Sequence, residues 1–219
     1  MTCLRYASGL EHEGNDPVSQ KTHAKKDRSV PVDFQASMGG IAGYVRFTRA
    51  EPERQDGLEI LGRLIPDCSI LEKSLVTDWC GIGVSAEPGR RNASAPKDCS
   101  GDSLTVLGCG EVYNADAGSP CDAIRRLYQD DRLEGLADLN GPFAAAICDP
   151  EKGAVVLVND RYGLYPIYYH SDAACFCFSQ KIRTLLRAGA DRTLRKDAVT
   201  EFLSLGYLPG DNTFFEHIF

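Results

Sequence analysis

The side chains of this sequence with the widest chemistry are its thiols and imidazoles. Cysteines stand at positions 3, 68, 80, 99, 109, 121, 148, 175 and 177, and histidines at 12, 23, 170 and 217. A thiol can act as a nucleophile, or can bind zinc together with clustered ligands. The sequence has no Cys-x-x-Cys pair and no ligand spacing typical of zinc, so we predict reduced thiols and no metal site. Cys3 and Cys109 are the candidate nucleophiles.

A glycine-rich segment, Met38-Gly39-Gly40-Ile41-Ala42-Gly43-Tyr44, opens an apolar run that predicts a buried strand over 40–47. From these residues alone, the favoured interpretation of the glycines is a tight start of the strand, rather than a pocket in which the backbone meets a ligand. The segment resembles the Met-Cys-Gly-Ile-Ala-Gly start of class II (Ntn-type) glutamine amidotransferase domains. In that family the methionine is removed and the freed cysteine attacks the glutamine amide, with its own α-amine as the base. Here the nucleophile position is Gly39, which has no side chain.

A second segment, Cys109-Gly110-Glu111-Val112-Tyr113-Asn114, resembles the Asn-Gly-Glu-(Ile/Val)-Tyr-Asn segment of asparagine-synthetase-type amidotransferase domains. The resemblance implies that the family's Asn-Gly stabilises the oxyanion of the tetrahedral intermediate. Cys109 stands at the asparagine position, and a thiol is a weak donor. The residues alone predict the end of a strand followed by a turn.

The glutamine-binding residues of the family are also replaced. Aligned on Leu127-Tyr128, Pro120 falls where the family has the aspartate that holds the glutamine α-amine, and Asp122 aligns with a glutamate. The family's arginine for the α-carboxylate is expected within 81–86, which contains no arginine. We therefore interpret the residues at these positions as a vestigial glutamine pocket. Its members are Gly39, Gly40, Cys109, Gly110, Glu111, Pro120 and Asp122.

The scaffold motifs of the family are present. The segments 139–149, 160–169 and 206–210 resemble Leu-Asn-Gly-Met-Phe-Ala-Phe-Ala-Ile-Trp-Asp, Asp-Arg-Phe-Gly-Ile-Lys-Pro-Leu-Tyr-Tyr and Gly-Tyr-(Val/Ile)-Pro-Gly. Asp160 and Arg161 admit a catalytic interpretation, but a structural ion pair that fixes the turn at Gly163 and Pro166 is favoured.

Apolar periodicity predicts mixed α and β structure, with helices over 180–188 and 196–205. The resemblance implies an α+β fold: a four-layer αββα sandwich of two mainly antiparallel sheets. It covers 38–219, which we assign to one glutamine amidotransferase type 2-like domain. Residues 1–37 are polar and aperiodic, which predicts a disordered extension or a start codon assigned too far upstream.

The formal net charge of −7 and pI near 5.1 disfavour nucleic acid and anionic membranes as partners. No apolar run is long enough to span a membrane, and there is no signal-like segment. We expect a cytoplasmic protein.

Taken together, these patterns predict an inactivated glutaminase domain that docks with an ATP-dependent, asparagine-synthetase-like ligase domain, in cis or in trans. That domain would carry a Ser-Gly-Gly-x-Asp-Ser loop for ATP and Mg, which is absent from these residues, so no cofactor is expected here. The chain is expected to be a fragment of such an enzyme. The alternatives are an active glutaminase domain of a glutamine-hydrolysing asparagine synthase and a stand-alone small-molecule binding module. A homodimer is left open.

Overall fold

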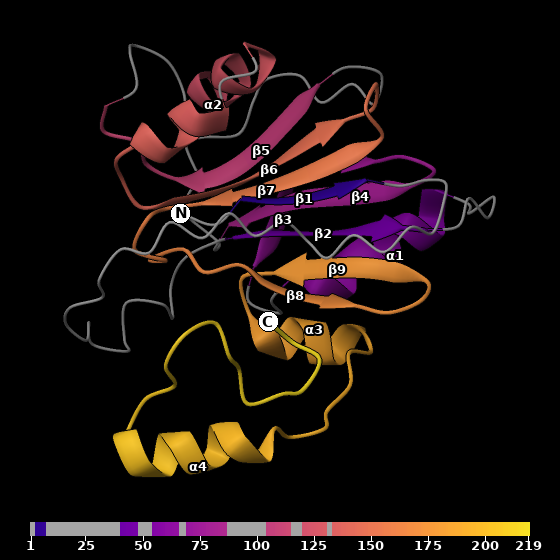
Figure 1. The fold of residues 1–219 in the computed structure, drawn as a ribbon. Coiled ribbons are helices and arrows are strands. Elements are labelled where there is room, and N and C mark those ends of the chain that lie inside the picture. The colour runs from indigo at the N-terminus through magenta and orange to yellow at the C-terminus, as the bar shows by residue number, and fades with distance from the viewer. Residues whose placement is uncertain are drawn as a thin grey trace.

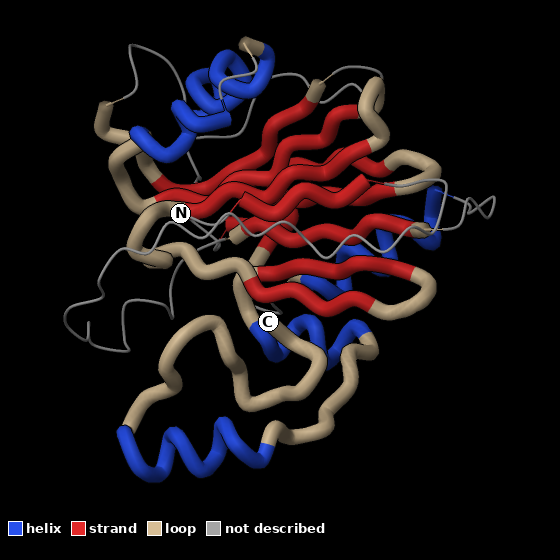
Figure 2. Tube along the Cα trace, viewed as in Figure 1, coloured by secondary structure: helices blue, strands red, loops and turns tan. Residues whose placement is uncertain are grey.

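The computed structural model of this protein describes residues 3–7, 40–47, 54–65, 69–86, 104–114, 120–130 and 133–219. Two antiparallel sheets fill the centre of the molecule (Figures 1 and 2). The first sheet has the order β1 (Cys3–Ala7), β7 (Ala154–Asn159), β6 (Phe143–Asp149) and β5 (Thr105–Gly110). The second has the order β3 (Ile70–Val76), β4 (Cys80–Ala86), β2 (Ile41–Arg46), β9 (Cys175–Ser179) and β8 (Tyr168–Ser171).

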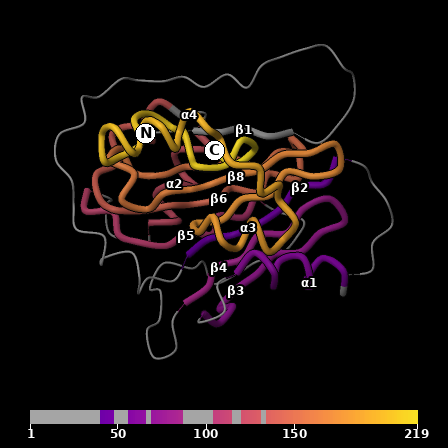
Figure 3. The backbone as a smooth tube through the Cα atoms, turned by 90° about the horizontal axis from the view of Figure 1, so that it is seen from below, coloured from indigo at the N-terminus to yellow at the C-terminus, as the bar shows by residue number. Residues whose placement is uncertain are grey.

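Helices cover the outer faces of both sheets. The helix α2 (Pro120–Gln129) and the 3-10 helix η2 (Leu133–Asp138) pack on the four-stranded sheet. The helices α1 (Arg54–Leu64) and α3 (Ile182–Ala188) pack on the five-stranded sheet and lie side by side when seen from below (Figure 3). The last helix, α4 (Lys196–Leu205), is set apart from the sheets in Figure 1.

Three apolar clusters account for the four layers. Alternate side chains of β6 point to opposite faces, as the strand period requires. Ala144 and Ala146 join the core between the two sheets, whereas Phe143 and Ile147 join the core under α2. A third cluster joins α1 and α3 to the outer face of the second sheet. The predicted αββα sandwich is therefore confirmed.

The N-terminal segment differs in part from its prediction. Sequence analysis predicted disorder over 1–37, but Cys3–Ala7 forms β1 and pairs antiparallel with β7 from Cys3–Val158 to Ala7–Ala154. The prediction is wrong for these five residues, because a free sheet edge supplies pairing that local composition does not reveal. The rest of the predicted extension lies outside the described residues.

The ring of Tyr44 is enclosed by glycines. A Cβ atom at Gly81 would lie within 3 Å of the Tyr44 ring, and one at Gly57 would meet the Tyr44 hydroxyl, so both glycines leave room for the ring. The hydroxyl itself is buried without a hydrogen-bond partner among the described residues. Burial raises the pKa of Tyr44 to about 12.

Replacing Tyr44 by phenylalanine is expected to raise the free energy of unfolding by about 1 kcal/mol, because it removes an unsatisfied buried hydroxyl. Urea denaturation measures the change. Tyr128→Phe is the matched control: its buried hydroxyl donates to Asp149 Oδ2 at 2.8 Å, so the same deletion should destabilise the fold. Equal destabilisation by both variants would contradict the assignment.

Candidate functional site

Three segments far apart in sequence meet at one end of the sheets. Gly40 directly precedes β2, Gln180 directly follows β9, and Cys109 lies near the end of β5. The pairing of Ala42 with Ser179 brings the first two together, and packing of one sheet on the other adds the third. This is the place where the sequence predicted a vestigial glutamine pocket.

Gly40 is buried and its backbone is fully engaged with β4. Its N–H donates to Ser85 Oγ at 3.3 Å, and its carbonyl accepts from the N–H of Ser85 at 2.8 Å. A Cβ atom at this position would overlap the Gln180 carboxamide. Any larger residue here would therefore require the Gln180 side chain to move. Gly39, the expected nucleophile position, lies outside the described residues.

Cys109 presents a protonated thiol. Its Sγ donates to Gln180 Oε1 at 3.7 Å, and burial raises its pKa to about 12. Because the thiolate is the nucleophilic form, this thiol is inert near neutral pH. The Gln180 carboxamide accepts this bond, while its buried Nε2 has no hydrogen-bond partner among the described residues.

The residues after Cys109 form the predicted strand end and turn. Gly110 adopts a φ of +95°, and the N–H of Glu111 donates to the carbonyl of Pro142 at 2.8 Å. Asn114 closes the turn: its Nδ2 donates to the carbonyl of Asp138, and its Oδ1 accepts from the N–H of Asn140, both at 2.8 Å. The side chain of Glu111 is exposed.

Pro120 and Asp122 lie in the first turn of α2, on the other face of the four-stranded sheet. Pro120 is the first helical residue, where its missing N–H costs nothing. Asp122 is exposed, whereas Cys121 between them is buried, close enough to contribute to the raised pKa of Cys109. The segment 81–86, where the family's arginine was expected, lies in β4, whose seven residues are all buried.

The side chains of Asp160 and Arg161 have other partners than the ion pair that sequence analysis predicted. The buried carboxylate of Asp160 accepts from the backbone N–H groups of Tyr162 (3.0 Å), Leu164 (3.0 Å) and Tyr165 (2.9 Å). Arg161 Nη2 donates instead to the carbonyl of Ala137 at 2.9 Å. The predicted Asp160–Arg161 ion pair is therefore wrong, because the carboxylate is turned inward to the turn's own N–H groups. The turn itself, with Gly163 at φ +64° and Pro166 after it, is present.

A polar hollow of about 110 Å³ lies beside this turn, lined by Asp138, Leu139, Asn140, Gly141, Arg161 and Tyr162. It does not include Gly40, Cys109 or Gln180. Within the described ranges, no group of three or more His, Cys, Asp or Glu side chains is arranged to hold a metal ion, and no helix is long and apolar enough to cross a membrane. The absence of cofactors remains a prediction.

Sequence reasoning did not single out Gln180 or Ser85. Their partners lie 71 and 45 residues away in the chain, so only the folded sheets reveal these contacts.

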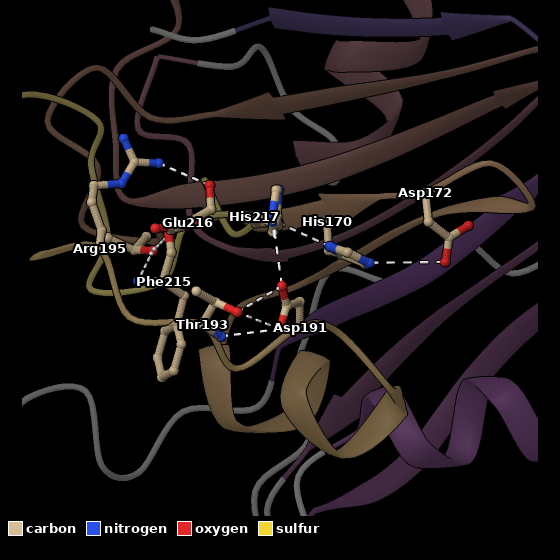
Figure 4. Close-up of polar contacts among 9 residues, drawn as sticks. His170, Asp172, Asp191, Thr193, Arg195, Phe215, Glu216 and His217 are labelled. Carbon is tan, nitrogen blue, oxygen red and sulfur yellow. Dashed lines mark hydrogen bonds and ion pairs between the residues drawn. The ribbon is translucent and has the colours of Figure 1, made fainter.

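The polar contacts of the last residues fix the C-terminal segment on the body (Figure 4). The ring Nδ1 of the nearly buried His170 lies 2.9 Å from the carbonyl of His217. The His217 Nε2 lies 3.6 Å from the Asp191 carboxylate, and Arg195 Nη2 donates to the carbonyl of Glu216 at 2.9 Å. The loop after α4 therefore returns to β8 and is held there.

Two antiparallel sheets stacked between helices, with a candidate pocket at the start of β2, define an α+β sandwich that fits the Ntn-hydrolase class. A family model described as a glutamine amidotransferase domain matches residues 105–219. The chain belongs to this family, as the class II resemblance predicted.

Its curated relatives include several asparagine synthetases named as glutamine-hydrolysing. Asparagine synthetase 3 of Bacillus subtilis is 27% identical over 196 residues, which cover 77% of this chain and 31% of that protein. Asparagine synthetase B of Escherichia coli is 41% identical over 63 residues, covering 29% of this chain and 11% of that protein. Asparagine synthetase 2 of B. subtilis is 30% identical over 95 residues, covering 38% and 13%. The chain therefore spans a third or less of the length of these relatives.

Proposed function

We propose that this chain is a glutamine amidotransferase domain without glutaminase activity that docks with an ATP-dependent, amide-forming synthetase domain of the asparagine synthetase type. One observation carries the first half: the thiol nearest the expected oxyanion site, Cys109, is buried, protonated and bonded to Gln180. The glycine at 39 and the lack of arginine over 81–86 add support from the sequence. ATP and Mg belong to the synthetase domain in this proposal, and the location is the cytoplasm.

The glutaminase alternative requires a nucleophile that the described residues of the candidate pocket do not offer. Cys109 has a raised pKa, and its thiol donates a hydrogen bond to the amide of Gln180 rather than to a base. Cys3 lies on β1, at the opposite edge of the four-stranded sheet from β5. Strands are about 4.8 Å apart, so roughly 14 Å separates the backbone of β1 from that of β5, which carries Cys109.

The purified chain is expected to release no ammonia from glutamine above the non-enzymatic background, because the part of the candidate pocket that the structure describes holds neither a nucleophilic thiolate nor a base for one. E. coli asparagine synthetase B, assayed in parallel, provides the positive control. Glutamine-dependent ammonia that disappears in Cys109→Ala would refute the proposal. A small molecule that stabilises the chain in a thermal-shift screen, with a concentration dependence that follows mass action, would favour the binding-module alternative.

The docking half of the proposal is supported by the region around α4. Of its residues only Ala198 is buried, and the exposed fractions of Leu203, Leu205 and Tyr207 are 79%, 53% and 61%. Apolar side chains gathered on one exposed element are typical of a protein–protein contact. The C-terminal contacts of Figure 4 anchor the segments at both ends of α4, which presents this surface in a fixed orientation.

Co-expression with the part of B. subtilis asparagine synthetase 3 that this chain does not match tests the docking. We expect the two to co-purify, and Leu203→Glu to weaken the complex at least tenfold, because a buried unpaired charge is costly at an interface. Ile70→Glu is the control, since Ile70 is also apolar and exposed but lies on β3. No co-purification, or equal loss with Ile70→Glu, would contradict docking at α4. A dimer of the chain broken by Leu203→Glu would instead assign the surface to a second copy.

A further inference from the structure

Two thiols outside the candidate pocket lie against each other on β9. Cys175 and Cys177 are two residues apart in one strand, so their side chains project from the same face of the sheet. Their sulfur atoms are 3.6 Å apart. Cys175 is only partly buried, whereas Cys177 is buried under α1 and α3. The arrangement places an accessible thiol directly over an enclosed one.

The surroundings give the two thiols different roles. The hydrogen bond from Cys177 lowers the pKa of Cys175, and the positive charge of Arg46 acts in the same direction, against burial and Asp172. The same hydrogen bond, together with burial, raises the pKa of Cys177. Cys175 is therefore the more easily ionised thiol and the more exposed one, which are the two properties that make a thiol oxidisable.

We propose that Cys175 and Cys177 form a reversible oxidation site, at which a hydroperoxide converts the two thiols into an intrastrand disulfide. In the first step the Cys175 thiolate attacks the peroxide: an S–O bond forms, the O–O bond breaks, and the leaving alkoxide or hydroxide takes a proton from water. In the second step Cys177 attacks the sulfenic sulfur, so that an S–S bond forms and water leaves with the Cys177 proton. The thiols lose two electrons, which the peroxide gains.

Strand geometry makes this disulfide easy to reduce again. Two residues of a strand span about 6.6 Å, at the upper end of the roughly 4.4–6.8 Å that a disulfide allows between Cα atoms. A bond formed at that limit is strained, and strained disulfides are the labile ones. A dithiol reductant should therefore restore both thiols in the folded protein.

The chain contains its own control pair. Cys80 of β4 and Cys148 of β6 bring their sulfur atoms to 3.5 Å across the two sheets, but both residues have no exposed surface. The distance between the two sulfur atoms is nearly the same as at Cys175 and Cys177, whereas the accessibility of the thiols differs. If accessibility controls the reaction, peroxide should oxidise the β9 pair and spare the pair between the sheets.

Peptide mass mapping tests the proposal on the folded chain. Trypsin cleavage after Arg161 and Lys181 releases peptide 162–181, whose only cysteines are Cys175 and Cys177. After treatment with hydrogen peroxide and blocking of free thiols, we expect this peptide to be lighter by two hydrogen atoms and unblocked, and to regain two blockable thiols after dithiothreitol. The peptides with Cys80 and Cys148 should be fully blocked after unfolding, and a urea-unfolded sample should show oxidation at all sites.

Variants separate the two steps. Cys177→Ser should leave a sulfenic acid at Cys175 that dimedone labels, whereas Cys175→Ser should leave Cys177 unoxidised. The proposal is overturned if peptide 162–181 keeps both thiols at a peroxide dose that oxidises the unfolded chain. It is also overturned if Cys80 and Cys148 react first, or if dimedone labels Cys177 and not Cys175.

Discussion

Replacing Gly110 by alanine is expected to lower the free energy of unfolding by about 4 kcal/mol, which is the largest effect we expect from a single methyl group in this protein. Two costs combine. Gly110 has a φ of +95°, which side-chain-bearing residues rarely adopt. The added Cβ would also run into the carbonyl oxygen of Pro142 and lie 2.8 Å from the Cα of Phe143, and backbone atoms of a central strand cannot move aside easily. Urea denaturation of the folded chain measures the loss.

Gly163→Ala separates the two costs. Gly163 also has a positive φ, +64°, but a Cβ there would meet nothing within 4 Å. Only the conformational cost remains, so a loss of about 1 kcal/mol is expected. If the two alanine variants lost the same stability, close packing at Gly110 would play no part, and the contact between β5 and the start of β6 would need to be looser than described.

Replacing Asp160 by alanine is expected to cost about 3 kcal/mol, because three backbone N–H groups lose a charged acceptor at once. These donors, on Tyr162, Leu164 and Tyr165, belong to the turn that connects β7 to β8. Asp160→Asn keeps one acceptor oxygen and should lose less. Thermal and urea unfolding, monitored by tyrosine fluorescence, give the order of the variants.

Asp172→Ala provides the matched control for Asp160. Its Oδ1 also accepts from two backbone N–H groups, those of Ala174 and Cys175, each at 2.8 Å, but its side chain is half exposed. Water can replace the lost acceptor at an exposed turn, so about 0.5 kcal/mol is expected. An Asp160→Ala variant as stable as Asp172→Ala would mean that the buried carboxylate does not organise its turn, and Arg161→Ala would then become the variant to examine.

Local sequence determined most of the secondary structure. The helix predicted over 196–205 is α4, residue for residue, and the helix predicted over 180–188 contains α3, which spans Ile182–Ala188. These predictions succeed because the periodicity of apolar residues and the presence of turn-forming residues are local signals, contained within a few neighbouring positions of the chain. The scaffold motif at 139–149 likewise ends in β6, as its resemblance implied. The strand β1 escaped prediction, since its hydrogen bonds come from β7, some 150 residues later.

The same division between what the sequence determined and what the tertiary structure decided applies to the candidate pocket. Sequence by itself determined that position 39 is a glycine, that 81–86 has no arginine and that residue 109 is a cysteine. It did not determine that Cys109 bonds to Gln180, that Asp160 turns away from Arg161, or that Cys175 lies partly exposed over a buried Cys177. Each of these depends on which strands become neighbours and which face is covered by a helix. A sequence records the type and order of side chains, but the distances, burial and hydrogen-bond partners that set their chemistry arise only when the two sheets pack together.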